Sequence, residues 1–419
     1  MFTKPIDQAI PDHVPADLVW DHDLDTFNSE LDDPYLAASR LHQGPDIIWA
    51  RSAMFGHPTW VLTRHDHIKE AYGDPERFSS DRNNLGALGV SWKLNPLEFD
   101  PPEHHYYRRI LNPHFTPTAV TSLDGAVRDA CGLLMDRIAA RGSCEFIGEF
   151  AELFPSYIFL DLMGLPHDML PQFLIWERDM MRSPEPAERV TAMRAILAYL
   201  EDFVAEQMKN PGSSLLKGIV ASRYRDERPL TKDEVLGMCY LFYIGGLDTV
   251  YSSLGWYMRH LANDWPLQER LRNNPDDIPR AVEELLRAYP VAAPHRTVKK
   301  DIEFHGVRMR KGEDVLLPTY LAGRDPLAYP EPHRVDIDRN PRHLAFGSGP
   351  HNCLGMHLAR RELKTVLAVF LSRCHNIRIP AGESCSYHVG STFGVDRLPL
   401  EWDQPAQQGR GAHSSLAAL

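Results

Sequence analysis

Apolar residues recur with a helical period over most of the chain between residues 117 and 287. The clearest segments are 119–140, 150–163, 189–208 and 214–222. This spacing puts one apolar stripe on each helix, which a core can bury. Gly142 follows the first segment, as is typical of a helix C-terminus. We therefore expect a mainly helical protein.

Short alternating segments near both ends of the chain predict a smaller amount of β-structure. Residues 46–50 and 59–63 have the pattern of two strands of a hairpin, which turns at Gly56 and Pro58. Further short strands are expected over 302–307 and 314–317 and close to the C-terminus, after a last helix over 356–372. The expected fold class is mainly α with minor β.

The longest predicted helix begins at Thr231-Lys232-Asp233-Glu234, the pattern of a capping box. It extends to about His260, roughly 45 Å at 1.5 Å per residue. Its interior contains Gly245-Gly246 and then Asp248-Thr249. Interior glycines cost about 1 kcal/mol each relative to alanine. Either they let another element pack closely, or they open a groove beside the helix.

Composition is that of a soluble globular protein, with 43% hydrophobic and 24% charged residues among 419. No linker or repeat divides the chain, so one domain is expected over 1–403 and a disordered tail over 404–419. The net charge of −12 argues against nucleic acid or an anionic membrane as the main partner. Six cysteines without paired metal spacing, and no apolar run of membrane length, predict an unanchored cytoplasmic monomer.

The candidate chemistry centres on the ten residues from Phe346 to Gly355. Glycine and proline exclude a helix or a central strand here. Cys353 comes just before a helical segment, where backbone N–H groups and the helix dipole stabilise a thiolate. One thiolate with one open axial position suits an oxygen-activating heme iron. On residue type alone, a structural cysteine is the more common explanation.

The spacing Phe-Gly-x-Gly-x-His-x-Cys-x-Gly resembles the heme-binding signature of the cytochrome P-450 family, the heme-thiolate monooxygenases. The resemblance implies the fold of that family and heme b with Cys353 as the proximal iron ligand. Phe346 would pack near the sulfur, and His351 would bond a heme propionate. Gly347 and Gly355 would leave room for N–H groups directed at the sulfur.

Gly245-Gly246-Leu247-Asp248-Thr249 resembles the oxygen-binding helix motif of the same family. By this match Thr249 would hold dioxygen and a water, and Asp248 would relay protons. Glu284 and Arg287 resemble the family's Glu-x-x-Arg pair, with Arg339 as its third partner. The resemblance gives these three a structural role, whereas the bare pattern would be a surface ion pair of little value.

Three further residues match positions that bind heme propionates in the family: His104 and Arg108 on an early helix, and Arg296 on a strand. Arginine binds carboxylates bidentately, so these side chains suit the role. A metal site formed by some of the 20 histidines is the competing hypothesis, but no His-x-x-His or Cys-x-x-Cys cluster supports it.

Within the family, the chain resembles the bacterial camphor hydroxylase group most, through residues 100–103, 245–249, 357–362 and 398–402. This implies hydroxylation of a small terpenoid, monoterpenoid or norisoprenoid, with O2 and with electrons from NADH through a flavin reductase and a [2Fe–2S] ferredoxin. A basic patch on the proximal face would steer the ferredoxin. Its residues would be Arg108, Arg109, Arg360, Arg361 and Lys364.

One departure concerns the substrate. Trp92 stands where camphor hydroxylase has a tyrosine that bonds the substrate ketone, and Pro294 stands where the group has an aspartate near a propionate. The resemblance predicts a mostly apolar substrate pocket lined by Trp92, Leu94, Leu241, Ile244, Gly245, Val291, Ala292 and Thr392.

Two alternatives remain open. One is a heme-thiolate sensor or binding protein without turnover, and the other is a peroxide-using heme enzyme of the same fold. The pair Asp248-Thr249 argues against both, because neither needs a proton relay to dioxygen.

Overall fold

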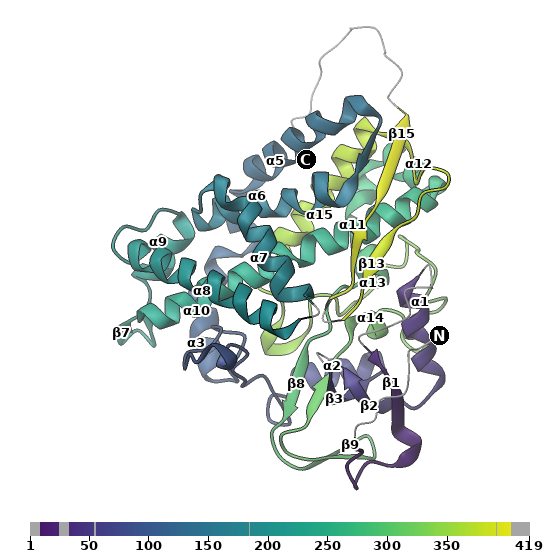
Figure 1. The fold of residues 1–419 in the computed structure, drawn as a ribbon. Helices are drawn as coiled ribbons and strands as arrows, with labels where there is room; N and C mark the ends of the chain where they lie inside the picture. Colours follow the sequence, from purple (N-terminus) through teal and green to yellow (C-terminus); the bar gives the residue numbers. More distant parts are fainter. Residues whose placement is uncertain (1–8, 25–32, 54–55, 184, 391, 404–419) are drawn as a thin grey trace.

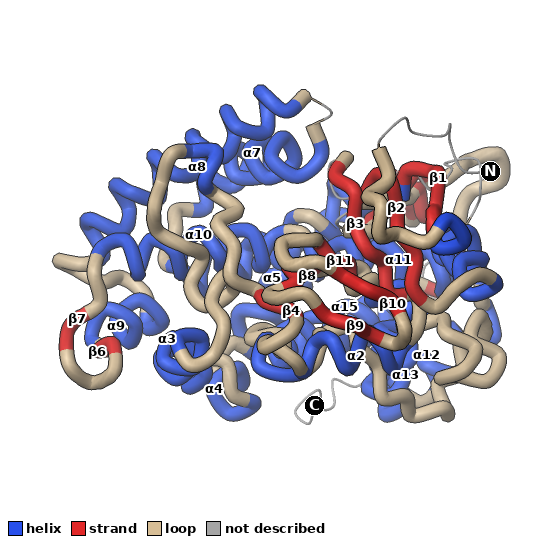
Figure 2. Tube along the Cα trace, turned by 90° about the horizontal axis from the view of Figure 1, so that it is seen from below, coloured by secondary structure: helices blue, strands red, loops and turns tan. Residues whose placement is uncertain are grey.

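The structure is a computed structural model that describes residues 9–24, 33–53, 56–183, 185–390 and 392–403. Helices fill most of the molecule, and a mixed sheet lies at one side of them (Figure 1). In the view turned by 90°, the sheet and the α3, α8 and α10 region lie at opposite ends (Figure 2). Residues 404–419 lie outside the described part, so the domain over 1–403 and the disordered tail stay predictions.

The helices carry the labels of Figure 1. They are α1 (Pro34–Ser39), α2 (His65–Gly73), α3 (Glu103–Leu111), α4 (Pro117–Thr121), α5 (Asp124–Ile138), α6 (Leu153–Met163), α7 (Leu170–Arg182), α8 (Pro186–Gln207), α9 (Ser214–Ala221), α10 (Lys232–Leu247), α11 (Thr249–Asn263), α12 (Trp265–Asn273), α13 (Ile278–Ala288), α14 (Thr319–Ala322) and α15 (Met356–Arg373).

Six strands form the main sheet in the order β1 (Val19–Asp23), β2 (Ile47–Ala53), β3 (His57–Leu62), β11 (Asp314–Leu316), β8 (His295–Val298) and β4 (Phe78–Ser79). The other sheets pair β9 (Ile302–Phe304) with β10 (Val307–Met309), β13 (Ser386–His388) with β14 (Gly394–Arg397), β6 (Arg223–Tyr224) with β7 (Arg228–Pro229), and β15 (Pro399–Asp403) with both β12 (His375–Arg378) and β5 (Ser143–Glu145). The predicted hairpin is confirmed as the antiparallel pair β2–β3.

The helix expected to run unbroken from Thr231 to His260 is interrupted. The capping box at Thr231 and Glu234 is present, but α10 ends at Leu247 and α11 begins at Thr249. Asp248 stands between the two helices, and short polar side chains of this kind can weaken a helix by competing for backbone hydrogen bonds. This helix is also not the longest of those described, since α8 has 22 residues. The segment expected over 119–140 is likewise divided between α4 and α5.

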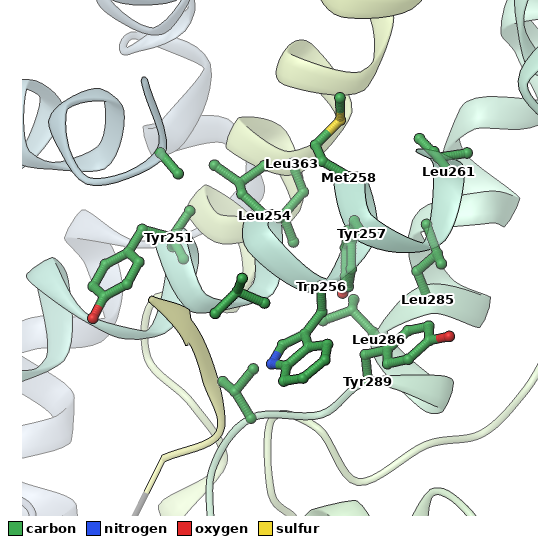
Figure 3. Close-up of a cluster of buried hydrophobic side chains, with 14 of the residues drawn as sticks. Tyr251, Leu254, Trp256, Tyr257, Met258, Leu261, Leu285, Leu286, Tyr289 and Leu363 are labelled. Atoms are coloured by element: carbon green, nitrogen blue, oxygen red, sulfur yellow. The ribbon is translucent and has the colours of Figure 1, made fainter. Parts of the chain in front are cut away.

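The largest hydrophobic cluster joins α5, α6, α11, α13, α15 and the C-terminal strands. Figure 3 shows part of it, with side chains of α11 directed at α13 and α15. The Trp256 and Tyr289 rings stack there, 6.2 Å apart. A second cluster joins α3 and α6–α10, and a third lies on the main sheet. The helices on either side of the Asp248 break are therefore fixed by separate clusters.

A buried ionic triad holds α13 against the segment that leads to the cysteine loop. Glu284 accepts hydrogen bonds from Arg287 at 2.6 Å and from Arg339 at 3.2 Å. Arg287 also donates to the carbonyls of Gly323, Pro332 and Arg334. Because both members of the central pair are fully buried, the surface-pair explanation is wrong and the structural one is confirmed.

Candidate active site

The loop before α15 holds Cys353 in a tight backbone conformation. The Cys353 N–H donates to the Phe346 carbonyl at 2.9 Å. Gly347 and Gly349 have φ of 69° and 67°, which side chains rarely adopt. A Cβ on Gly349 would also come within 2.5 Å of the Tyr72 carbonyl oxygen. The glycines of the motif thus let the loop turn and approach α2.

Cys353 is accessible, unlike the buried Cys131, Cys239 and Cys374, yet the protein surrounds it. Burial raises the pKa of its thiol, although the Gly355 N–H and the charges of Arg108 and Arg360 act in the opposite direction. The accessibility of Cys353 and its burial within the fold agree if the sulfur faces open space that the fold encloses. Burial thus opposes the thiolate, while the Gly355 N–H and the two arginines favour it.

The predicted propionate residues come together from three distant parts of the chain. The His104 and His351 rings lie 4.1 Å apart, and the charges of Arg108 and Arg296 act on both. Burial, followed by these neighbouring charges, lowers the pKa of His104 to about 4 and that of His351 to about 2. Arg108 donates to the Asn352 carbonyl at 3.0 Å, and Arg296 is only 5% exposed.

This cluster lacks the anion that its charge requires. Among the described residues, none of His104, Arg108, Arg296 and His351 forms an ion pair with a carboxylate. Both ring nitrogens of His104 and Nε2 of His351 are buried without a partner in the same part of the chain. Buried cations and donors are costly unless an anion completes them. The site therefore fits a prosthetic group that carries carboxylates beside Cys353.

Tyr72 is a member of this site that the sequence analysis missed. Its hydroxyl is buried without a partner within the described residues, and the Arg296 guanidinium lies 5.6 Å from its ring centroid. Burial raises the pKa of Tyr72 above its usual value, so it is a neutral donor. No local pattern marks it, because its place depends on how α2 packs against the cysteine loop.

The two glycines of α10 differ in role: one allows close packing, and the other lies beside open space. Gly246 is a packing glycine, since its Cβ would lie 2.8 Å from Cδ2 of Phe159. Gly245 is exposed, and a Cβ there would meet nothing within 4 Å. Thr249 donates its hydroxyl to the Gly245 carbonyl at 3.3 Å. Open space thus lies beside the turn that carries Thr249.

Asp248 is buried and paired. One carboxylate oxygen, Oδ1, accepts from Nη2 of Arg182 on α7 at 3.2 Å, and the other is buried without a partner within the described chain. Arg182 was not foreseen, because it lies 66 residues before Asp248 and no motif includes it. The ion pair gives the carboxylate a fixed position at the break between α10 and α11.

The predicted pocket residues come from both sides of that break. Leu94 belongs to the second hydrophobic cluster, with Trp92, Leu241 and Ile244 packed against it. Val291 belongs to the first cluster, and its carbonyl accepts from the Phe393 N–H at 2.8 Å. An isolated bridge pairs Ala292 with Thr392, which ties the two C-terminal segments of the pocket together.

The loop that carries Trp92 is fastened on its C-terminal side. The buried Glu98 carboxylate accepts from the N–H groups of Leu94 and Asn84, at 2.7 and 2.6 Å. The Asn95 amide donates to the Glu234 carbonyl at 3.0 Å. Gly237 on α10 lies against the same loop, because its Cβ would come within 2.2 Å of the Lys93 carbonyl oxygen.

The expected basic patch is largely neutralised. Arg109 pairs with Asp226 at 2.6 Å, Arg360 forms two bonds to Glu283 at 2.6 and 2.9 Å, and Arg361 pairs with Asp124. Burial lowers the pKa of Lys364, and the neighbouring Arg360 and Arg361 act in the same direction. The five cations are present, but three share their charge with carboxylates.

Comparison with known proteins gives the family of this chain. A family model described as Cytochrome P450 matches residues 191–386. The probable cytochrome P450 127A1 of Sinorhizobium fredii is 37% identical over 402 residues, which are 94% of this chain and 97% of that protein. The steroid C26-monooxygenase of Mycobacterium tuberculosis is 31% identical and covers 81% of this chain and 94% of its own. The crystal structure of cytochrome P450 CYP101C1 matches with a TM-score of 0.84 and 33% identity, covering 94% of this chain and all of that one.

The fold and site define a heme-thiolate monooxygenase, and the chain belongs to the cytochrome P450 family. It is an oxidoreductase that incorporates one oxygen atom and binds heme through a cysteine thiolate. Across the ranges that the structure describes, no group of His, Cys, Asp and Glu could hold another metal ion. No helix in those ranges has the length and apolarity needed to cross a bilayer.

Proposed function

We propose that this monooxygenase hydroxylates a small hydrophobic substrate of terpenoid type, monoterpenoid or norisoprenoid. It would use O2 and electrons from NADH, delivered by a reductase and a [2Fe–2S] ferredoxin. One observation carries the assignment of the site. Cys353, enclosed but accessible, lies beside four buried or half-buried cationic or imidazole side chains that pair with no carboxylate in the described chain.

In this proposal Cys353 would ligate the heme iron, and the cluster around His104 and His351 would bind the propionates. Tyr72 adds one more hydroxyl donor to that cluster. Heme, when bound, supplies the activation of dioxygen. The protein's own contribution there is to fix the carboxylates bidentately and through imidazole N–H groups, and to direct the Gly355 N–H at the sulfur.

Thr249 and Asp248 would deliver protons on the side of the site opposite Cys353. The Thr249 hydroxyl donates to a backbone carbonyl, so its oxygen is free to accept a hydrogen bond from a water or from protonated oxygen. Asp248 is held by Arg182 with one oxygen unused. That oxygen can accept a proton from solvent and return it toward the Thr249 turn, which is general acid catalysis.

The substrate class rests on the lining of the pocket. Leucine, isoleucine, valine and alanine dominate it, and Trp92 and Thr392 are its few polar side chains. Such a pocket selects substrates by shape. Its discrimination between substrates that differ by one methylene group is modest, about 1–3 kcal/mol. We expect several compact alicyclic compounds to bind, and camphor not to be favoured, because an indole replaces the tyrosine at Trp92.

The electron donor would dock on the face that carries Arg108, Arg109 and Lys364. The ion pairs of Arg109, Arg360 and Arg361 reduce the local charge, so steering should be weaker than five free cations would give. A matched test is the salt dependence of ferredoxin-driven reduction in Arg109→Gln, with Arg141→Gln, far along the chain on another exposed ion pair, as control.

The test of the site is the CO difference spectrum of the reduced protein. The wild type should give the red-shifted Soret band of thiolate ligation, Cys353→Ser should lose it, and Cys385→Ser should keep it. A variant Cys353→Ser that still gives this band would refute the ligand assignment.

Turnover separates the enzyme from a heme-thiolate sensor. Spin-state titrations with bicyclic monoterpenoids and norisoprenoid ketones, followed by product analysis with the best binder, should give an alcohol bearing one oxygen atom from O2. Binding without any oxygenated product would favour the sensor.

A further inference from the structure

A group of carboxyl side chains surrounds Arg182 behind the Asp248 break. Arg182 contacts Asp248 at 3.2 Å and Asp396 on β14 at 3.6 Å. Glu177 lies on the same helix, α7, and the charge of Asp248 acts on it directly. Glu152, just before α6, feels the charges of Arg182 and Asp396. Arg182 is therefore the main cation near four acids. In the described chain, the only other positive charge that acts on Glu177 is that of Arg178, which is mostly exposed.

Glu177 is the most enclosed acid of this group after Asp248. It is 4% exposed, and its Oε1 is buried without a hydrogen-bond partner among the described residues. One turn earlier, the Phe173 carbonyl accepts from the Tyr243 hydroxyl at 2.5 Å, which ties α7 to α10. Glu177 thus lies on the helix that carries Arg182, one turn after the point where that helix is tied to α10.

Several other polar atoms around Asp248 are equally unpaired. Within the described ranges, Oδ2 of Asp248, Nε of Arg182, the Tyr251 hydroxyl, Oγ of Ser252 and Nε2 of His388 are buried without a partner. Figure 3 shows the Tyr251 ring at one end of the α11 cluster, with its hydroxyl directed away from Trp256 and Tyr289.

These atoms are neighbours. The Arg182 guanidinium lies 5.1 Å from the Tyr251 ring centroid, and His388 bonds Asp396 at 2.7 Å. A Cβ on Gly394 would lie within 2.3 Å of His388 and 2.9 Å of the Ser252 hydroxyl. So many unsatisfied groups in one place indicate ordered water between them, since buried polar groups nearly always find a partner.

Asp248 accepts directly from Arg182, whereas no ion pair with a cation is present for Glu177 in the described chain. Burial, followed by the Asp248 charge, raises the pKa of Glu177 to about 8, while Arg182 and Arg178 act against that shift. The charge of Glu177 in turn acts on Tyr243, the titratable neighbour on α10. Glu177 therefore favours its protonated form at neutral pH.

We propose that Glu177 is the proton store that recharges Asp248 during turnover, through water held by the unpaired polar atoms around Arg182. This rests on the proposed role of Asp248. In the step, the Glu177 O–H bond breaks and an O–H bond forms on Asp248 after the latter has passed its proton toward Thr249. Glu177 becomes a carboxylate, and solvent near the half-exposed edge at Asp396 returns a proton to it. No electrons change hands.

The protonation state of Glu177 can be measured without turnover. Infrared difference spectra of the heme-loaded resting enzyme, in H2O and D2O, should show a carbonyl band of a buried carboxylic acid at pH 7, lost with a midpoint near pH 8. Glu177→Gln should lose the Glu177 part of this band, and Asp179→Asn, which removes an exposed carboxylate of the same helix, should keep the full intensity. Burial also raises the pKa of Glu362 to about 8, so Glu362→Gln identifies the part of the band that belongs to that acid. If the wild type lacks the band, or Glu177→Gln leaves its intensity unchanged, the proposal is overturned.

Turnover tests the role itself. With the terpenoid that gives the largest spin-state shift, Glu177→Gln should lower product formed per NADH about 10-fold and increase the solvent isotope effect, while Asp179→Asn should match the wild type. Glu177→Asp, which restores an acid, should recover part of the loss and guards against a folding defect.

The outcomes separate this proposal from the function on which it rests. If Thr249→Ala and Asp248→Asn leave coupling unchanged, the proposed relay fails, whatever Glu177 does. If those two variants uncouple the enzyme but Glu177→Gln does not, the relay stands and the proton store is refuted.

Discussion

His104 and His351 place their imidazole rings 4.1 Å apart, centroid to centroid, in the interior beside Cys353. Burial and two arginines disfavour the charged form of both rings, so in this setting each offers an N–H donor rather than a charge. An anion placed among them would raise both pKa values. The pair therefore suits a site that binds a carboxylate.

Replacing either histidine should loosen heme. We expect His104→Leu and His351→Leu each to reduce heme affinity by about 1.5–3 kcal/mol, the value of a hydrogen bond to a charged group. Heme transfer to apomyoglobin measures this loss. His105→Leu, on the exposed side of the same helix, is the control, and an equal loss in that variant would contradict the assignment.

The glycines of α10 should respond in opposite ways. Gly245→Ala should stabilise the protein by about 1 kcal/mol, because alanine favours the helix and nothing obstructs its Cβ. The methyl group should also weaken CO binding, because it enters the open space. Gly246→Ala should lose about 1–3 kcal/mol, because the Phe159 ring must shift. Urea unfolding of the two variants measures the sign of each change in unfolding free energy. Destabilisation by both substitutions would rule out the open space beside Gly245.

The buried triad of α13 should dominate stability. Arg287→Met leaves the Glu284 carboxylate buried without its main partner, which costs about 3–5 kcal/mol. Arg334→Met breaks only an exposed pair with Glu331 and should cost less than about 1 kcal/mol. Chemical unfolding of the heme-loaded proteins compares them. Similar midpoints for the two variants would show that the triad carries little of the stability.

Acid should weaken the start of α10 in a defined range. Although burial opposes it, hydrogen bonds from Arg228, the Thr231 N–H and Tyr107 lower the pKa of Glu234 to about 2. A group with a lowered pKa stabilises the fold fully above its unfolded value and loses that effect as pH falls through the folded one. The stability gap between the wild type and Glu234→Gln, about 2–3 kcal/mol at pH 6, should thus close between about pH 4.5 and 2.

Unfolding midpoints over that pH series measure the gap. Glu227→Gln, an exposed neighbour, should show no such dependence. A gap that stayed constant down to pH 3 would assign the effect of Glu234 to packing instead of charge.

Much of this molecule is readable in its sequence, for local reasons. Capping residues, glycine and helical periodicity act over a few positions, so the capping box at Thr231, the β2–β3 hairpin and the motif around Cys353 could be predicted. The grouping of His104 with His351 came only from resemblance, since no local pattern links an early helix to a late loop.

What the sequence could not predict depends on packing between distant segments. Arg182 reaches Asp248 only because the C-terminal end of α7 lies near the break between α10 and α11. The break itself was missed, because Asp248 weakens a helix without forbidding it. The burial of Cys353, which raises the pKa of its thiol, likewise depends on packing that no local pattern shows.

The attachment of the Trp92 loop has a consequence for how this pocket can change over evolution. Lys93 lies against Gly237 with no room for a methyl group, and Leu94 and Asn95 are bound by buried acceptors. Substitutions on that side must disturb α10 and so the turn that carries Thr249. Before Trp92, the Val90 carbonyl accepts from the Asn83 amide at 3.1 Å, an exposed contact that involves no residue of α10. New substrates should therefore be acquired by changes between Gly86 and Trp92, where the shape of the cavity can vary while the oxygen chemistry stays intact.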